Sequence, residues 1–103
     1  MIFDPKRWQT LSDYEQLGNI GSAFFRAAKG ATSYDETFEL LDLTIADPRW
    51  KGRDKELLRL REAITDLMNQ TQNYGVTAEQ LNQYFLGFAI AARQNERRGQ
   101  VVV

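Results

Sequence analysis

The sequence predicts an all-α protein, an antiparallel up-and-down four-helix bundle with a short N-terminal helix or turn. In four segments, apolar side chains recur at the three- and four-residue spacing of a helix. Each segment begins with residues typical of a helix start, and most of them end at glycine or before proline. The connections are short, which favours antiparallel neighbours. Because 103 residues suit one core, we expect one domain over residues 1–99 and a loose tail over 100–103.

The N-terminal part of the chain predicts a short helix or turn, followed by the first long helix. Asp4 followed by Pro5 is typical of a helix start. Ser12 and Glu15 have the spacing of a capping box, in which each side chain bonds the backbone N–H of the other residue. We therefore expect the first long helix over residues 13–28.

Two glycines mark this helix. Gly30 is expected to end it, since glycine readily takes the left-handed conformation of a helix stop. Gly21 lies in the middle of its apolar face, to which we also assign Tyr14 and Phe25. A glycine inside a helix costs about 1 kcal/mol relative to alanine. We expect another helix to cross closely at Gly21, and a ligand touching the bare backbone is the alternative.

Residues 33–71 predict a helical hairpin made of an acidic helix and a basic helix. Ser33 and Glu36 have the spacing of a second capping box. Pro48 ends the acidic helix, because the residue before a proline avoids helical geometry. The basic helix is expected to start with Asp54 as its cap.

The hairpin carries two residues with specific expected positions. Trp50, in the connection, is expected to pack over the core. Arg61 flanks the apolar face of the basic helix, where its charged end can reach out to solvent or pair with an acid across the hairpin. We expect this helix to end near Thr71, before a stop at residues 73–75.

The last helix is expected to begin after Thr77, which forms a capping-box pattern with Gln80, and to stop at Gly99. Its inner face holds five residues at helical spacing: Leu81, Tyr84, Phe85, Phe88 and Ala92.

A second apolar stripe lies on the opposite side of this helix. Leu86 and Ile90 are four residues apart, and Ala89 extends the stripe. A helix that is apolar on two sides is either central in its fold or covered by a partner. Leu86, Ile90 and Ala89 are therefore our candidate partner-binding residues. The alternative is a tightly wrapped fold that buries both sides.

Composition excludes several kinds of chemistry. The chain has no cysteine and no histidine, which excludes disulfides, thiolate or imidazole metal sites and histidine bases. An all-carboxylate magnesium site is conceivable, but its five acids are expected on outward helix faces: Glu36, Glu39, Asp42, Glu62 and Asp66. We therefore expect no enzyme activity, metal or cofactor. With no signal peptide pattern and no apolar run approaching 18 residues, we expect a cytoplasmic protein that does not enter membranes.

Basic residues gather in the middle of the chain. Our basic-patch candidates are Arg49, Lys51, Arg53, Lys55 and Arg59. They suggest nucleic acid as a second class of partner, although the net charge of −1 argues against a broadly basic surface. A solvated turn and helix start is the simpler interpretation.

The sequence resembles a group of short prokaryotic proteins of unknown function. Four stretches carry the resemblance, namely residues 18–22, 41–50, 57–62 and 84–93, which read GNIGS, LDLTIADPRW, LLRLRE and YFLGFAIAAR. It implies one compact helical unit and no activity. A looser, topology-level likeness is to HEPN-type bundles, the helical partners of small nucleotidyltransferases in toxin–antitoxin pairs. The chain lacks their Arg–His catalytic motif, so that likeness would imply a binding role.

The sequence as a whole favours a small non-catalytic protein–protein interaction module. We expect it to self-associate or to dock a partner protein through its last helix. The alternative is a nucleic-acid-associated accessory protein, similar to toxin–antitoxin components, that uses the basic segment over residues 49–61.

Overall fold

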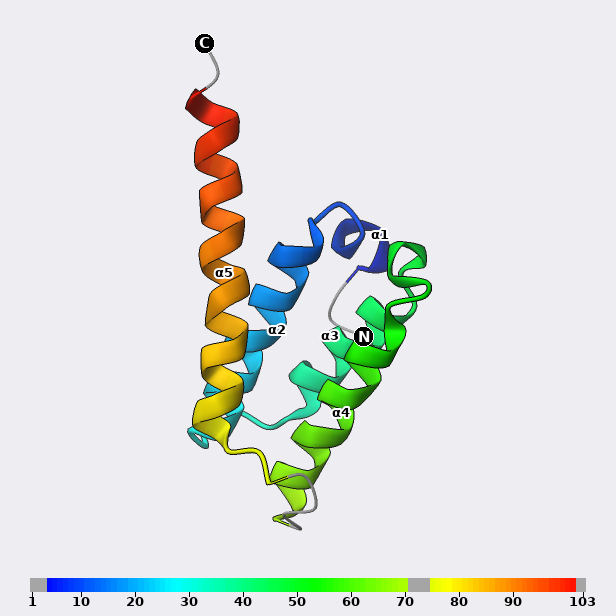
Figure 1. The fold of residues 1–103 in the computed structure, drawn as a ribbon. Helices are drawn as coiled ribbons and strands as arrows, with labels where there is room; N and C mark the ends of the chain where they lie inside the picture. The colour runs from blue at the N-terminus through cyan, green and yellow to red at the C-terminus, as the bar shows by residue number, and fades with distance from the viewer. Residues whose placement is uncertain (1–3, 71–74, 102–103) are drawn as a thin grey trace.

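The fold consists of helices only in the part of the chain that the structure describes. A computed structural model describes residues 4–70 and 75–101, without the side chains of 95–101. The elements are α1 (Pro5–Trp8), α2 (Asp13–Ala28), α3 (Asp35–Ile45), a 3-10 helix η1 (Pro48–Trp50), α4 (Asp54–Asn69) and α5 (Ala78–Val101) (Figure 1). The all-α prediction is confirmed.

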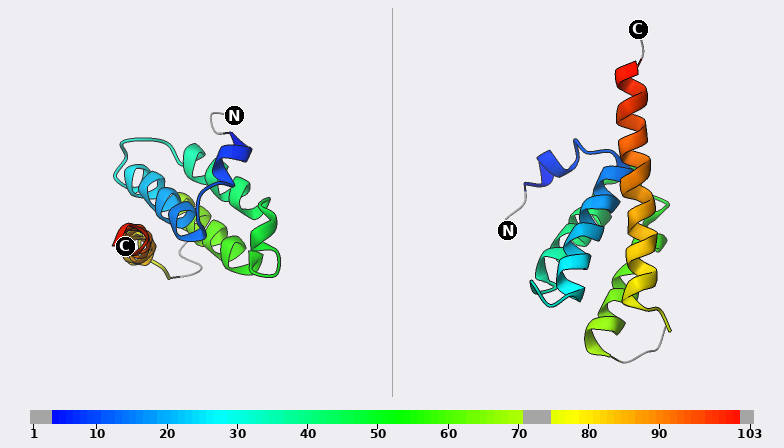
Figure 2. Two further views of the ribbon diagram at one scale, coloured as in Figure 1. Left: turned by 90° about the horizontal axis from the view of Figure 1, so that it is seen from above. Right: turned by 90° about the vertical axis from the view of Figure 1, so that its left-hand side faces the viewer.

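The long helices α2, α3, α4 and α5 run in alternating directions (Figure 1). Helix α2 packs against both α3 and α5, and α3 also packs against α4 and α1. Figure 2 shows α5 beside α2, with its last turns extending past the other helices. The radius of gyration is therefore 14.2 Å, against about 13 Å for a compact domain of this length.

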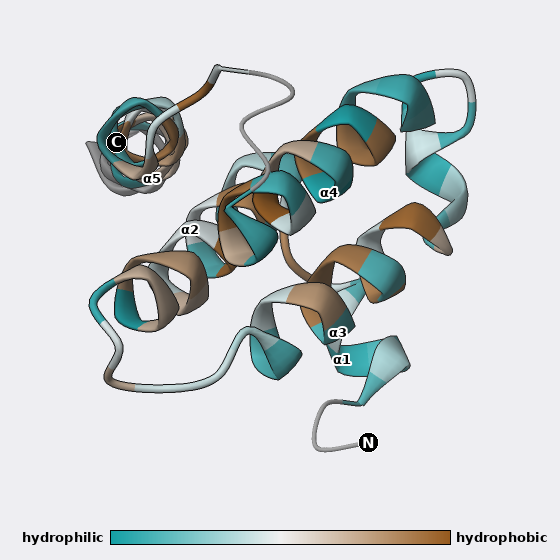
Figure 3. Cartoon of the chain, turned by 90° about the horizontal axis from the view of Figure 1, so that it is seen from below, coloured by the Kyte–Doolittle hydropathy of each residue, from teal (hydrophilic) through white to brown (hydrophobic). Residues whose placement is uncertain are grey.

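One core joins all of these elements. Hydrophobic segments recur along α2, α3 and α4 (Figure 3). The side chains with 2% exposure or less in this core include Leu17, Ile20, Phe24, Leu40, Leu41, Trp50, Leu57 and Ile64. Trp50 is fully buried, as expected for a residue that packs over the core.

Three of the expected helix starts are confirmed. The Asp4 side chain accepts a hydrogen bond from the Lys6 backbone N–H at the start of α1. Both reciprocal bonds of the capping box between Ser12 and Glu15 are present at the start of α2. At the start of α5, the backbone N–H groups of Thr77 and Gln80 each bond to the side chain of the other residue.

The capping box expected at Ser33 was wrong. Helix α3 begins at Asp35, and the preceding Tyr34 has helical backbone angles and provides no side-chain cap. The Glu36 carboxylate is instead bound by Arg26 of α2, at 3.1 Å. The Ser33 hydroxyl accepts a hydrogen bond from the Asp35 backbone N–H at 3.3 Å, rather than from Glu36 as the capping box requires.

Two other helix boundaries differ from the expectation, and a third borders residues that the structure does not describe. Arg53, not Asp54, occupies the N-cap position of α4 and makes no side-chain cap bond, so that Asp54 is the first helical residue. Gln70 follows the last turn of α4 in the left-handed conformation, with φ of 57°. The expected end at Thr71 and most of the stop at 73–75 lie outside the described residues. Helix α5 runs past Gly99 to Val101, because one glycine weakens a helix without having to end it.

Candidate interaction surface on α5

Two glycines of α2 hold α5 in place. A Cβ atom added at Gly21 would lie 2.3 Å from Cβ of Phe85, and one added at Gly18 would lie 3.3 Å from Cα of Ala89. Such distances leave room only for glycine at Gly21. The expectation of a close helix crossing at this position is confirmed, and the crossing helix is α5.

The inner face of α5 is largely as expected. Leu81 and Phe85 are buried, while Tyr84 and Phe88 are partly buried against the core. The ring of Phe88 packs against that of Tyr14 in α2, with centroids 5.9 Å apart. The packing of α5 on the core therefore uses this face.

The opposite face of α5 is open. Leu86 and Ile90 are 51% and 47% exposed, so the fold does not wrap around both sides of the helix. Ala89 differs from them, because it lies over Gly18 and is partly buried. The structure thus places two of the three candidate partner-binding residues on one exposed face and the third in the α2–α5 contact.

An open groove borders this face. It has a volume of about 440 Å³ and runs between α2 and α5, with Phe25, Leu86 and Ala89 among its lining residues. We expected Phe25 to be buried, but its ring is 46% exposed, and the Lys29 ammonium lies 4.6 Å from the ring centre. The ring lies at the rim of the helix contact, and sequence periodicity cannot separate a rim position from an interior one.

A second groove, of about 750 Å³, lies on the other side of α5, toward α4. The Tyr84 hydroxyl donates a hydrogen bond to Oε1 of Glu56 across it. Burial, followed by this bond and the charge of Glu56, raises the pKa of Tyr84 far above its usual range. Tyr84 therefore stays protonated, and its hydroxyl links α5 to α4 through this hydrogen bond.

Two members of the basic-patch candidates contact their own chain. The Arg49 guanidinium bonds the backbone carbonyls of Gln9 and Leu11 and pairs with Asp47 at 3.2 Å. Arg53 stacks on the Trp50 ring at 4.4 Å and pairs with Asp13 at 3.3 Å.

The other three basic-patch candidates, Lys51, Lys55 and Arg59, are exposed. Arg61, outside that set, pairs with Asp42 of α3 at 3.1 Å, as expected. The basic segment therefore divides into residues that hold the fold and residues that face solvent.

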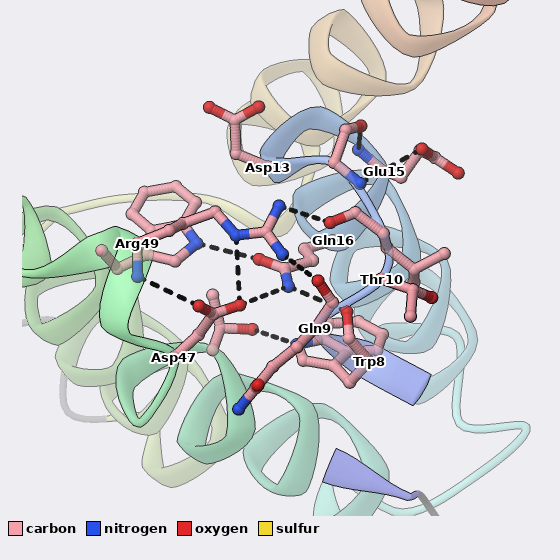
Figure 4. A network of polar contacts seen from close by, with 12 residues as sticks. Trp8, Gln9, Thr10, Asp13, Glu15, Gln16, Asp47 and Arg49 are labelled. Carbon is pink, nitrogen blue, oxygen red and sulfur yellow. Dashed lines mark hydrogen bonds and ion pairs between the residues drawn. The ribbon is translucent and has the colours of Figure 1, made fainter. Parts of the chain in front are cut away.

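No sequence pattern indicates the buried polar network that is centred on Gln16 (Figure 4). The Gln16 amide N–H₂ donates to the Trp8 carbonyl at 3.0 Å and to Asp47 at 2.9 Å. Its amide oxygen accepts from the Trp50 indole at 2.8 Å. These bonds tie α1, α2 and η1 together, and Gln16 itself has no exposed surface. The one available signal is the helical position of Gln16, which places it on the side of α2 that is buried against Trp8 and Trp50.

Asp47 carries the charge in this network. Burial opposes its ionisation, but the hydrogen bonds from Gln16 and Arg49 and the charge of Arg49 together outweigh burial and hold its pKa below its usual range. The Asp47 side chain is 4% exposed, and all of its bonds in this network go to residues of the same chain. The network therefore stabilises the fold rather than binding a ligand.

The acids considered for a magnesium site lie apart. Among the residues described, no three acidic side chains gather where they could hold a metal ion. Asp66, which we expected to face outward, is buried beside Val76 and Thr77. Residues 75–77, which lead into α5, line the same pocket as Asp66.

Comparisons with known proteins add no relative. No protein-family model, curated protein or solved structure matches the chain. Over its described residues, the chain has no helix long and apolar enough to cross a membrane.

Proposed function

We propose that the protein is a non-catalytic protein–protein interaction module, which docks a second copy of itself or another protein through the outer face of α5. The exposure of Leu86 and Ile90 on one helix face carries the proposal. Single exposed apolar side chains are normal, but neighbouring ones beside an apolar groove are typical of contact surfaces. Phe25 adds a third such side chain at the edge of the groove.

The same proposal includes an antiparallel up-and-down bundle in which α5 is the outermost helix. The alternating helix directions and the packing of α2 between α3 and α5 support it. In this arrangement α5 uses one face to hold the fold, and the far face remains for a partner. The module would thus need no rearrangement to bind.

Co-purification with matched variants tests the proposal. A tagged chain is produced in its native cells together with an untagged copy, and the proteins recovered with it are identified. Leu86→Asp places a charge on the proposed surface, and Leu58→Asp places one on α4, where Leu58 is 44% exposed. We expect wild type and Leu58→Asp to retain the same protein, either the untagged copy or another chain, and Leu86→Asp to lose it. Equal recovery by all three would refute the proposal.

Nucleic-acid binding is the second candidate function, and it depends on the exposed cations Lys51, Lys55 and Arg59. It ranks second because Asp47 and Asp13 offset the charges of Arg49 and Arg53. Fluorescence anisotropy with labelled oligonucleotides at low salt tests it. Binding that weakens steeply with salt and is lost when the three cations are replaced by serine would support it, whereas no binding at low salt would exclude it.

A further inference from the structure

The outer face of α5 has a regular pattern along its length. Gln83, Leu86, Ile90 and Arg93 follow one another at spacings of three, four and three residues, and all four are exposed. This is the spacing of the contact seam between two helices of a coiled coil. Glu79, also exposed, continues the pattern one turn before Gln83.

The charges along this seam have opposite signs at its two ends. Glu79 lies in the first turn of α5, Arg93 lies beyond Ile90, and the two apolar residues lie between them. A second α5 helix running antiparallel would bring its basic end to the acidic end of the first. A parallel partner would place like charges side by side and would also align the helix dipoles unfavourably.

We propose that two copies of this chain pair through α5, with the helices antiparallel around a two-fold axis level with residue 88. Leu86 then contacts Ile90 of the second copy, and Gln83 lies opposite Arg93 of the second copy. The two-fold symmetry makes each contact twice, as is usual for homodimers. This inference rests on the proposed function, since it selects a second copy as the occupant of the α5 surface and fixes its direction.

The length of α5 supports a second copy as the occupant. Figures 1 and 2 show its last turns extending past the rest of the fold, and helical turns without a packed neighbour are only marginally stable in water. Around the proposed axis, these turns run beside the first turns of α5 in the other copy. They also pass the open groove at Phe25. One arrangement therefore covers the seam, the groove and the extended helix end.

Cysteine cross-linking tests the direction of pairing, because the natural chain has no cysteine. Gln83→Cys, carrying a tag, and Arg93→Cys are oxidised separately and as a mixture. In the antiparallel pair the two positions face each other, so we expect a tagged–untagged disulfide dimer in the mixture. In either variant alone, the two cysteines would be about 15 Å apart along the helix axis, beyond the reach of a disulfide.

The controls separate the outcomes. Leu58→Cys mixed with Gln83→Cys measures cross-linking by random collision. Cross-linking that is as strong in each single variant as in the mixture would indicate parallel helices and overturn the inference. Cross-linking in the mixture that is no stronger than in the collision control would also overturn it.

Charge reversal provides a second measurement that does not depend on cysteine. By sedimentation at low salt, Arg93→Glu, whose new carboxylate lies within one turn of Glu79 of the second copy, should weaken the dimer roughly fivefold, and adding Gln83→Arg, directly opposite position 93, should restore it. Failure of the second change to restore the dimer would contradict the arrangement.

Failure of this inference is distinguishable from failure of the proposed function. A wild-type chain that sediments as a monomer at all concentrations overturns the paired α5 helices. The co-purification of another protein by wild type and not by Leu86→Asp would still support the interaction module.

Discussion

Replacing Gly21 with alanine should destabilise the protein, although alanine is the better helix former. The new methyl carbon would lie 2.3 Å from Cβ of Phe85, against at least 3.4 Å for an ordinary contact. Cβ of Phe85 is fixed to the backbone and cannot rotate away. Helix α5 must therefore move from α2 by about 1 Å, which opens the contacts of a side chain that is 3% exposed.

The magnitude follows from two opposing effects. Alanine gains about 1 kcal/mol of helix propensity. Overpacking costs about 1–3 kcal/mol, and partial loss of Phe85 packing adds to this cost. The net loss in the free energy of unfolding should be about 2 kcal/mol, or about 10 °C in the melting temperature.

Urea unfolding followed by circular dichroism measures this change, with Gly87→Ala as the matched control. Gly87 lies in the same helix as Phe85, and an added Cβ there meets no atom within 4 Å. Gly87→Ala should therefore stabilise the protein by up to about 1 kcal/mol. If Gly21→Ala unfolds at the same or a higher urea concentration than wild type, the close crossing of α2 and α5 is wrong.

Three further predictions concern the contacts that join the other helices. Gln16→Met keeps the shape of the side chain but leaves the groups that bond to Gln16 unpaired. The free energy of unfolding, measured by urea titration, should therefore fall by about 3 kcal/mol. An unchanged midpoint would contradict the stabilising role of these hydrogen bonds. Because the pKa of Asp47 is lowered by folding, its stabilising contribution is complete above about pH 4 and is lost as the pH falls through the folded-state pKa. Asp47→Asn should therefore lose less stability than wild type between pH 6 and pH 3, and parallel pH profiles would contradict this reasoning. Arg61→Ala removes an ion pair with Asp42 in which the two side chains are 41% and 59% exposed. Because solvent screens such a pair, the free energy of unfolding in the same titration should fall by less than about 1 kcal/mol, and a larger fall would contradict this screening.

Local sequence signals predicted the helices well, because their causes are local. Ser12 with Glu15 and Thr77 with Gln80 form the expected capping boxes, since each needs only residues three apart. At Ser33 the prediction was wrong, since its hydroxyl accepts from the Asp35 backbone N–H and the Glu36 carboxylate pairs with Arg26 of α2.

Burial was harder to predict wherever it depends on which element covers which face. Leu43 of α3 is 7% exposed and belongs to the same core as Trp8 of α1. Phe25 fits the apolar face of its helix, yet it is 46% exposed at the edge of the packing. The periodicity of apolar residues shows toward which side of a helix a side chain points. Whether another element covers that side depends on how the helices pack together.

The candidate surface was predictable in part. The exposed positions of Leu86 and Ile90 follow from helical angle alone, once the opposite face of α5 packs on the core. The role of Ala89 does not follow from angle, because it depends on Gly18 in another helix. Gln16 was missed because one buried amide among apolar residues has no sequence pattern of its own.

The Gln16 network has a consequence for spectroscopy. The chain has two tryptophans, and both bond to this one buried glutamine, Trp8 through its carbonyl and Trp50 through its indole. Indole fluorescence therefore reports on the end of the fold where α1, α2 and η1 meet, whereas α5 contributes no indole. A separation of α5 from α2 would lower the helical circular dichroism signal before tryptophan emission changed. The order of these two signals during unfolding would show which end of the molecule opens first.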